Sequence, residues 1–501
     1  MRRIGVLGAL LTVACTLCGV FASGAMAETE AQEVARGREL GIKAYIYGQP
    51  LLDMERIFET STSVNVATDI GYAPVNQLSH FKHLTTTNES VVVAPNDDTL
   101  YATGWLEMKK NKPMVVNVPA SSRFDVIEMV SPWTENFANV GTEASGILPP
   151  GEYLVAGPGT DEGKEELDGL KIIHSPYNRV WLIGRVVVEG SSDTEALPIE
   201  EQMRIVPLKN WLKGEALTFK PKPPSNEDTE PTIAHIPGTA EGESPMLYWK
   251  ALGKALKQFP PPEADKPILK ELAAVHIGRG KKPSKGNDGK GVARGLEEAV
   301  TAGPTQVLAD VKEAYLNGFA KHNGWLVTGA GTYGTNYVTR AEVDRLGVGA
   351  LLPNVSIYPL SLTDDTMAKL NGATKRYVVH FPASDFPFPV KAFWSLTMYE
   401  ASGFFVSNPL ERFALGNRSQ VNYNEDGSLN IYMQTGEPST EQQKANWLPA
   451  PAGEFHVVIR LYATEPQDIE PILEGTGSWQ TPLIEPCLES GSTAGGQECP
   501  S

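Results

Sequence analysis

The chain has 501 residues, of which 43 are Lys or Arg and 60 are Asp or Glu, so its net charge at pH 7 is -17. A surface this acidic repels nucleic acid and anionic membranes, which excludes nucleic acid as a partner. The chain is also too long for a single hydrophobic core, so we expect two or three domains.

The N-terminus has the three parts of a secretory signal peptide. Met1-Arg2-Arg3 is basic, residues 4–20 form an apolar run, and Ala25-Met26-Ala27 supplies the small residues that signal peptidase reads. The run is short for a membrane span of about 20 residues. Residues 1–27 are therefore predicted to be a signal peptide, cleaved between Ala27 and Glu28. We expect a mature protein in the periplasm or outside the cell, with no stable membrane insertion.

Helical and strand patterns then alternate along the chain. Residues 28–60 have apolar side chains at helical spacing, and Gly48 and Pro50 predict a break into two helices. Residues 61–220 contain short β-rich runs separated by turn residues, a pattern typical of a β-sandwich. The runs are residues 91–93, 114–118, 124–130, 153–156 and 180–188.

The second half repeats this change from a helical pattern to strand-like runs. A Pro-rich, charged segment suits a linker, and the helical periodicity after it completes a predicted linker and helical module over 221–345. Strand-like runs return over 346–485 and predict a second β-sandwich. The fold class is therefore mainly β with helical modules: N-terminal helices, a sandwich, a helical middle module and a second sandwich.

Two cysteines remain after the predicted signal peptide is removed, and both lie in the tail formed by residues 486–501. In an oxidising compartment, Cys487 and Cys499 can form a disulfide. A metal site would need further ligands, and no His lies near the pair. We predict a disulfide that holds the tail.

Several motifs point to one two-part family. They are residues 44–48, 94–101 and 151–158 in the first half, 333–341 in the middle, and 392–399, 426–429, 446–451 and 460–462 in the second half. The first half resembles domain-of-unknown-function family 1254, and the second half resembles its usual companion, family 1214. The resemblance implies two β-sandwiches, the second jelly-roll-like, joined by a helical module. It implies no activity, because fold alone does not define chemistry.

The turn at residues 96–98 is the first candidate site. Asn96, Asp97 and Asp98 follow an apolar run and precede Tyr101. Adjacent carboxylates in such a turn suit acid/base chemistry or a divalent cation, which is the one cofactor candidate. The alternative is a turn in which Asn and Asp side chains bond to their own backbone.

A second set of acids belongs to the first predicted sandwich. Glu128 lies on an otherwise apolar strand face, and Glu135 lies close to Trp133. A buried carboxylate is either paired or has a raised pKa. Arg185 lies mid-strand on an apolar face and needs an acid partner. We expect Arg185, Glu128 and the two aspartates of the turn to form one buried polar group, with structural salt bridges as the alternative.

Aromatic and hydroxyl side chains complete the list of candidates. Residues 391–399 place Trp394 and Tyr399 on opposite faces of a strand, and the face with Tyr399 would line a groove or face solvent. His456, Arg460 and Tyr462 share another strand face, which we interpret as structural. The predicted ligand-binding residues are Asn96, Tyr101, Trp133, Trp394 and Tyr399.

These features support functions of different classes. The first is an exported hydrolase or lyase that acts on a small polar or glycan-like molecule through carboxylate groups. The second is a non-catalytic envelope protein that binds such a ligand, and the third is an assembly or scaffold protein; a homo-oligomer is compatible with all three. Acids gathered in one closed pocket would favour the enzyme. The candidate catalytic residues are Asp97, Asp98, Glu128, Glu135 and Arg185.

Overall fold

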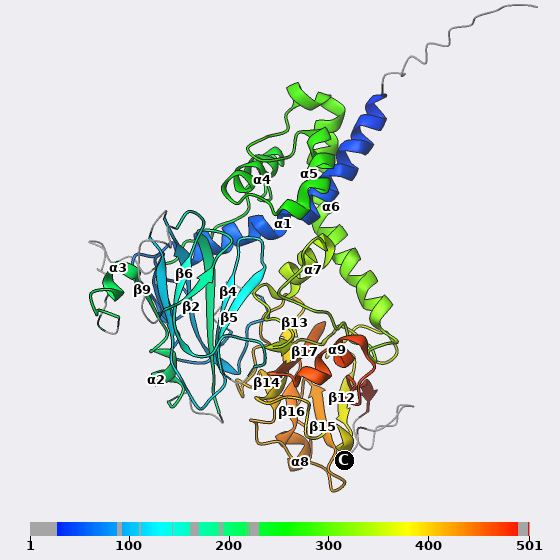
Figure 1. Cartoon of the computed structure of the whole chain (residues 1–501). Coiled ribbons are helices and arrows are strands. Elements are labelled where there is room, and N and C mark those ends of the chain that lie inside the picture. The colour runs from blue at the N-terminus through cyan, green and yellow to red at the C-terminus, as the bar shows by residue number, and fades with distance from the viewer. Residues whose placement is uncertain are drawn as a thin grey trace, which may run out of the picture.

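The computed structural model describes residues 28–87, 93–109, 112–142, 144–160, 170–189, 194–216, 218, 220, 230–488 and 499. The predicted signal peptide lies outside these residues. Figure 1 shows a first sandwich in cyan and a second in yellow to orange, with blue and green helices packed around them. The predicted order of helices, sandwich, helical module and second sandwich is confirmed. No helix in the described part of the chain is long and apolar enough to cross a membrane.

The first sandwich packs a five-stranded sheet, ordered β1-β2-β8-β4-β5, against a four-stranded sheet, ordered β7-β6-β3-β9. The central strand β8 is buried along its whole length. Its even-numbered side chains enter the sandwich core, while Trp181 and Ile183 pack against Met54 and Ile57 of α1. The strands are β1 (Leu78–His80), β2 (Thr99–Glu107), β3 (Met114–Val118), β4 (Asp125–Val130), β5 (Asn136–Gly141), β6 (Gly151–Ala156), β7 (Lys171–His174), β8 (Arg179–Val187) and β9 (Arg204–Pro207).

The second sandwich packs a sheet ordered β10-β17-β13-β14, with β11 also on β17, against a sheet ordered β16-β15-β12-β18. Odd-numbered residues of β17 enter its core, so the even-numbered side chains, including Arg460 and Tyr462, lie on the opposite face. The strands are β10 (Ser356–Ile357), β11 (Leu360–Ser361), β12 (Arg376–Phe381), β13 (Trp394–Glu400), β14 (Ala414–Gly416), β15 (Leu429–Gln434), β16 (Trp447–Pro449), β17 (Phe455–Tyr462) and β18 (Ile484–Cys487).

The helices gather mainly above the first sandwich, with α6 running down toward the second (Figure 1). Glycines let α1 and α6 approach closely: a Cβ on Gly37 would lie 2.4 Å from the carbonyl oxygen of Val292, and one on Gly295 would lie 2.2 Å from that of Val34. The helices are α1 (Glu30–Ser61), α2 (Leu197–Glu200), α3 (Leu208–Trp211), α4 (Met246–Gln258), α5 (Lys266–Leu272), α6 (Lys285–Gly318), α7 (Tyr337–Gly347), α8 (Glu441–Ala445) and α9 (Pro466–Glu474).

Helix α1 differs from the prediction. It continues without interruption through Gly48 and Pro50, so the predicted break into two helices is wrong. Tertiary packing overrides the local preference, because Gly48 and Pro50 are both buried and Leu252 of α4 packs directly against Gly48.

The C-terminal tail has the predicted geometry. Cys487 ends β18, and its Cα lies 4.8 Å from that of Cys499, with the two sulfur atoms bonded. This separation lies in the usual range for disulfides. The residues between Leu488 and Cys499 lie outside the described part of the chain.

Candidate binding cavity between the sandwiches

A cavity of about 210 Å³, which we call the junction cavity, lies between the two sandwiches and α7. The first sandwich contributes β2 and β8, and the second contributes β11 and β17. The end of α7 and the segment that follows it, residues 343–350, line the cavity between them. The cavity therefore lies between the faces of the central strands that do not pack in the core of either sandwich.

Strand alternation explains which side chains reach the junction cavity. Because successive side chains on a strand point to opposite faces, Trp181, Ile183 and Arg185 share the outer face of β8. In the same way, Val458 and Arg460 share the outer face of β17. All five residues line the cavity.

The walls are mostly apolar, and a few polar side chains lie among them. Asn96, Tyr101 and Arg185 come from the first sandwich, whereas Tyr462 and Arg460 come from the second. The Asn96 side-chain amide donates a hydrogen bond of 2.6 Å to the hydroxyl of Tyr462, which ties the two domains together at this point. Among the described residues that line the cavity, none is Asp, Glu, His, Lys or Cys.

Arg185 is buried, with 6% of its surface exposed, and pairs with Glu128. The register of β4 and β8 makes these residues diagonal neighbours on one face, and Arg185 Nη1 lies 3.3 Å from Glu128 Oε2. Arg185 Nη2 donates to the carbonyl oxygen of Gly349 at 2.9 Å. Burial raises the pKa of Glu128 to about 7, although the positive charge of Arg185 opposes this shift.

Arg460 is also buried, with 3% of its surface exposed. Its guanidinium donates to Thr397 Oγ1 at 2.7 Å, to the hydroxyl of Tyr399 at 2.6 Å and to the carbonyl oxygen of Ala94 at 3.1 Å. Within the part of the chain that the structure describes, no ion pair joins Arg460 to a carboxylate. A buried guanidinium whose hydrogen-bond partners are all neutral is uncommon, because burial of a charge is costly without a paired counter-charge. The carboxylates of Asp97 and Asp98 act on Arg460 only through their charge, without an ion pair.

The turn at residues 96–98 connects the domains. Asp98 Oδ1 forms an ion pair with Arg418, and Ser395 donates to Asp98 Oδ2 at 2.6 Å. Both carboxylate oxygens of Asp98 are thus used by the second sandwich. Burial, and then the neighbouring Asp98, raise the pKa of Asp97 well above its ordinary value. The described residues hold no group of three or more His, Cys, Asp or Glu that could hold a metal. At the turn where the sequence suggested a divalent metal cation, Asp98 binds the guanidinium of Arg418 instead.

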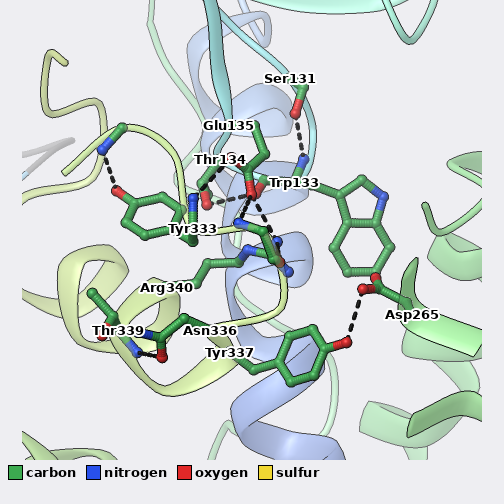
Figure 2. A network of polar contacts seen from close by, with 12 residues as sticks. Ser131, Trp133, Thr134, Glu135, Asp265, Tyr333, Asn336, Tyr337, Thr339 and Arg340 are labelled. Carbon is green, nitrogen blue, oxygen red and sulfur yellow. Dashed lines mark hydrogen bonds and ion pairs between the residues drawn. The ribbon is translucent and has the colours of Figure 1, made fainter. Parts of the chain in front are cut away.

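Glu135 belongs to a different network, shown in Figure 2. Its carboxylate accepts hydrogen bonds from the backbone of Tyr333 at 3.0 Å and Gly334 at 3.2 Å, and it pairs with Arg340 at 2.8 Å. In the same view, Tyr337 donates to Asp265 at 2.8 Å. This network joins the first sandwich to α7 and to the helical module, and Glu135 and Arg340 do not line the junction cavity.

The structure therefore divides the predicted polar group into separate ion pairs. Arg185 lies beside Glu128, but Asp98 pairs with Arg418 and Glu135 pairs with Arg340. The chemical roles predicted for these acids remain predictions.

The predicted aromatic platforms are also separated. Tyr101 and Asn96 line the junction cavity. Tyr399 does not line it, but its hydroxyl accepts a hydrogen bond from Arg460. Trp394 stacks on Phe388 in the core of the second sandwich, with ring centroids 4.4 Å apart. Trp133 is fully buried near Arg340.

Sequence reasoning overlooked the cationic side of the junction cavity. Arg460 and Tyr462 were interpreted as structural, although Arg460 has the signal that singled out Arg185: an arginine in the middle of an apolar strand. Arg418 follows β14 in a loop and carries no local signal. Its partner Asp98 is 320 positions away in the sequence.

Comparisons with known proteins identify both halves. Residues 75–207 match the family described as protein of unknown function (DUF1254), and residues 355–466 match protein of unknown function (DUF1214). This confirms the resemblance noted in the sequence. No curated protein matches the chain.

Two solved structures are similar. The crystal structure of the VPA0106 protein from Vibrio parahaemolyticus has 21% sequence identity and a TM-score of 0.60, and the match covers 90% of this chain and 100% of that chain. An uncharacterised protein from Burkholderia cenocepacia has 10% identity and a TM-score of 0.41, with 91% of this chain and 94% of that chain covered. The first similarity shows a common fold.

Proposed function

We propose that this chain, in which residues 75–207 match DUF1254 and residues 355–466 match DUF1214, is an exported, non-catalytic binding protein. Its site is the junction cavity, and its ligand is a small molecule with a largely apolar body. The Ala25-Met26-Ala27 signature supports export.

The composition of the cavity lining carries this proposal. Among the described lining residues, the charged side chains are the two arginines, Arg185 and Arg460. A guanidinium stays protonated near neutral pH, so it orients a ligand but does not exchange protons with it. The predicted catalytic acids Asp98 and Glu135 are engaged by other arginines, and they do not line the cavity.

The position and size of the cavity agree with a small ligand. Small-molecule sites occur preferentially at domain interfaces and combine apolar walls with a few placed polar groups. An apolar cavity of about 150 Å³ holds benzene, and the junction cavity is larger, at about 210 Å³. Because the walls are mostly apolar, an apolar body fits better than the glycan-like ligand expected from the sequence.

A cavity-filling variant tests the site. Ala330 lines the cavity, so Ala330→Phe should abolish binding of small aromatic and aliphatic molecules to the mature protein. Ala240 is exposed, and Ala240→Phe is the matched control. Isothermal titration should show saturable binding to the wild type and to the control variant. If no molecule of this kind binds, or if Ala330→Phe binds as well as the wild type, the proposal is wrong.

One observation favours the enzyme as a second candidate. Glu128 has a pKa near neutrality, at about 7, and lies beside Arg185 of the cavity lining. A carboxyl group with such a pKa is suited to general acid/base catalysis. An activity screen of the purified protein, with and without divalent metals and chelator, tests this candidate; activity that Glu128→Gln removes would support the hydrolase or lyase assignment.

A further inference from the structure

The junction cavity holds more positive than negative charge. Arg185 and Arg460 both line it. Glu128 is the acid that pairs with Arg185, and no described carboxylate forms an ion pair with Arg460. Asp98 does not make up the difference, because it pairs with Arg418 and accepts from Ser395. The charges of Arg460 and Arg418 also act on Asp97, but Asp97 forms no ion pair with Arg460 among the described residues, and burial together with Asp98 raises its pKa well above the ordinary value. One guanidinium charge therefore remains without a paired counter-charge.

The hydroxyl group of Tyr462 lies close to the guanidinium of Arg460. Tyr462 lies next to Arg460 and Arg185, since the charges of both arginines act on its hydroxyl. That oxygen accepts a hydrogen bond from Asn96, and among the described residues its own hydrogen has no acceptor. Burial raises the pKa of Tyr462 well above its ordinary value, so the side chain remains a neutral donor. Arg185 Nη1 is also buried, and it lies 3.3 Å from Glu128 Oε2 without hydrogen-bond geometry.

Much of the remaining lining is apolar, and its other polar groups are hydroxyls and an amide, which carry no charge. Trp181 and Ile183 come from β8, Val348 follows α7, and Leu360 and Val458 come from the second sandwich. All five side chains are buried. A ligand that fills the cavity therefore needs an apolar body and one group that accepts hydrogen bonds and carries one negative charge.

We propose that the junction cavity binds a small monocarboxylate, with its carboxylate held by Arg460, Tyr462 and Arg185 and its apolar body against Trp181 and Ile183. This inference rests on the proposed function and adds the chemical class of the ligand. A carboxylate matches the donor fork of a guanidinium and accepts charge-assisted hydrogen bonds, which are stronger than neutral ones. A single charge is selected because one guanidinium lacks a carboxylate partner.

Matched acids and amides test the inference on the unmodified mature protein. Phenylacetate and hexanoate are titrated at about pH 7, alongside phenylacetamide and hexanamide, which have nearly the same shape and no charge. We expect at least one acid to bind tenfold or more tightly than its amide. Equal affinities for the acid and its amide would overturn the monocarboxylate inference and leave the proposed function intact. If neither form binds, both are wrong.

A variant of Arg460 locates the effect. Because no described carboxylate forms an ion pair with Arg460, Arg460→Gln breaks no described ion pair, and it should remove the preference for the acid while leaving amide binding within about threefold of the wild type. The control is Arg179→Gln, a buried arginine on the same strand as Arg185 that pairs with Glu107 at 2.6 Å and does not line the cavity. Loss of the preference in both variants would show a long-range charge effect and overturn the inference. If Arg460→Gln does not fold, the comparison of acid and amide on the wild type decides the matter.

Discussion

Glu128 lies fully buried between Arg185 and the side chain of Asn136, which donates to its Oε2 at 3.2 Å. Burial disfavours the charged form of a carboxyl group, and one ion pair with one hydrogen bond to the same oxygen only partly offsets this cost. The second oxygen, Oε1, has no hydrogen-bond partner in the described part of the chain. The balance explains why this pKa rises despite the neighbouring positive charge.

The raised pKa of Glu128 predicts a pH dependence of stability. Because the pKa is about 7 in the folded protein and 4.5 as the ordinary value, the folded state keeps a proton that the unfolded state releases between these pH values. This contribution is fully present below about pH 4.5 and is lost as the pH rises to about 7. It amounts to about 3 kcal/mol, since each pKa unit corresponds to about 1.4 kcal/mol. Urea unfolding should show that, between about pH 4.5 and pH 7, the free energy of unfolding of the wild type falls by about 3 kcal/mol relative to that of Glu128→Gln, which does not titrate here. A difference between the two proteins that does not change with pH would contradict the account.

The ion pair of Asp98 and Arg418 leads to a second prediction at this scale. Asp98→Asn leaves the Arg418 guanidinium without its carboxylate in a largely buried place, so we expect the free energy of unfolding to fall by about 3 kcal/mol. The double variant Asp98→Asn with Arg418→Gln should recover part of the loss, because no charge is then stranded. A loss below about 1 kcal/mol in Asp98→Asn would mean that the pair contributes little, as exposed pairs do.

At the scale of elements, β8 and β17 explain the site. Each is a central strand that is buried on both faces. One face of each strand packs in the core of its own sandwich, and the other face packs at the junction between the sandwiches. Arginine in such a strand requires a partner or a ligand. Alternation along the sequence was sufficient to identify Arg185 in this way, and it would have been sufficient for Arg460.

Long-range packing set the limit of prediction. The sequence could not bring Asp98 to Arg418, because that contact depends on how two domains dock and not on either local pattern. The break expected at Pro50 failed for a related reason: α1 is held in place by packing against α4 and α6, which local propensity does not describe. The order of helical and β regions was predictable because periodicity records which faces are buried.

The packing of α1 against α6 gives a prediction about glycine. A Cβ on Gly37 would lie 2.4 Å from a backbone oxygen of α6, and a backbone atom cannot rotate away. Gly37→Ala should therefore lower the free energy of unfolding by about 1–3 kcal/mol, although alanine is the better helix former. The control is Gly286→Ala in α6, where the nearest atom would be 3.9 Å away. Thermal unfolding should show a lower melting temperature for Gly37→Ala alone, and equal effects of the two substitutions would contradict close helix contact.

At the scale of the whole molecule, the two sandwiches are joined by polar contacts as well as by apolar packing. Asn96 bonds to Tyr462, Asp98 to Arg418, and Arg460 reaches the backbone of Ala94. A further apolar cluster, including Phe124 and Phe393, lies at the same junction. Three of the motifs that revealed the family, residues 94–101, 392–399 and 460–462, contain residues that make these contacts.

Export is a prediction about the whole chain. The Ala25-Met26-Ala27 signature predicts that the mature protein begins at Glu28. The intact mass of protein recovered from the periplasm or the medium tests this directly. A mass that includes residues 1–27, or a lipid attached to Cys15, would contradict it.

The central claim is that the junction cavity holds a ligand, and a crystal structure of the mature protein grown with phenylacetate tests it most directly. The account predicts electron density in the cavity, with a carboxylate oxygen about 2.7–3.2 Å from a donor of Arg460 or Tyr462 and the ring against Trp181. Density for phenylacetate at another place, with the cavity unchanged and without ligand, would contradict the claim.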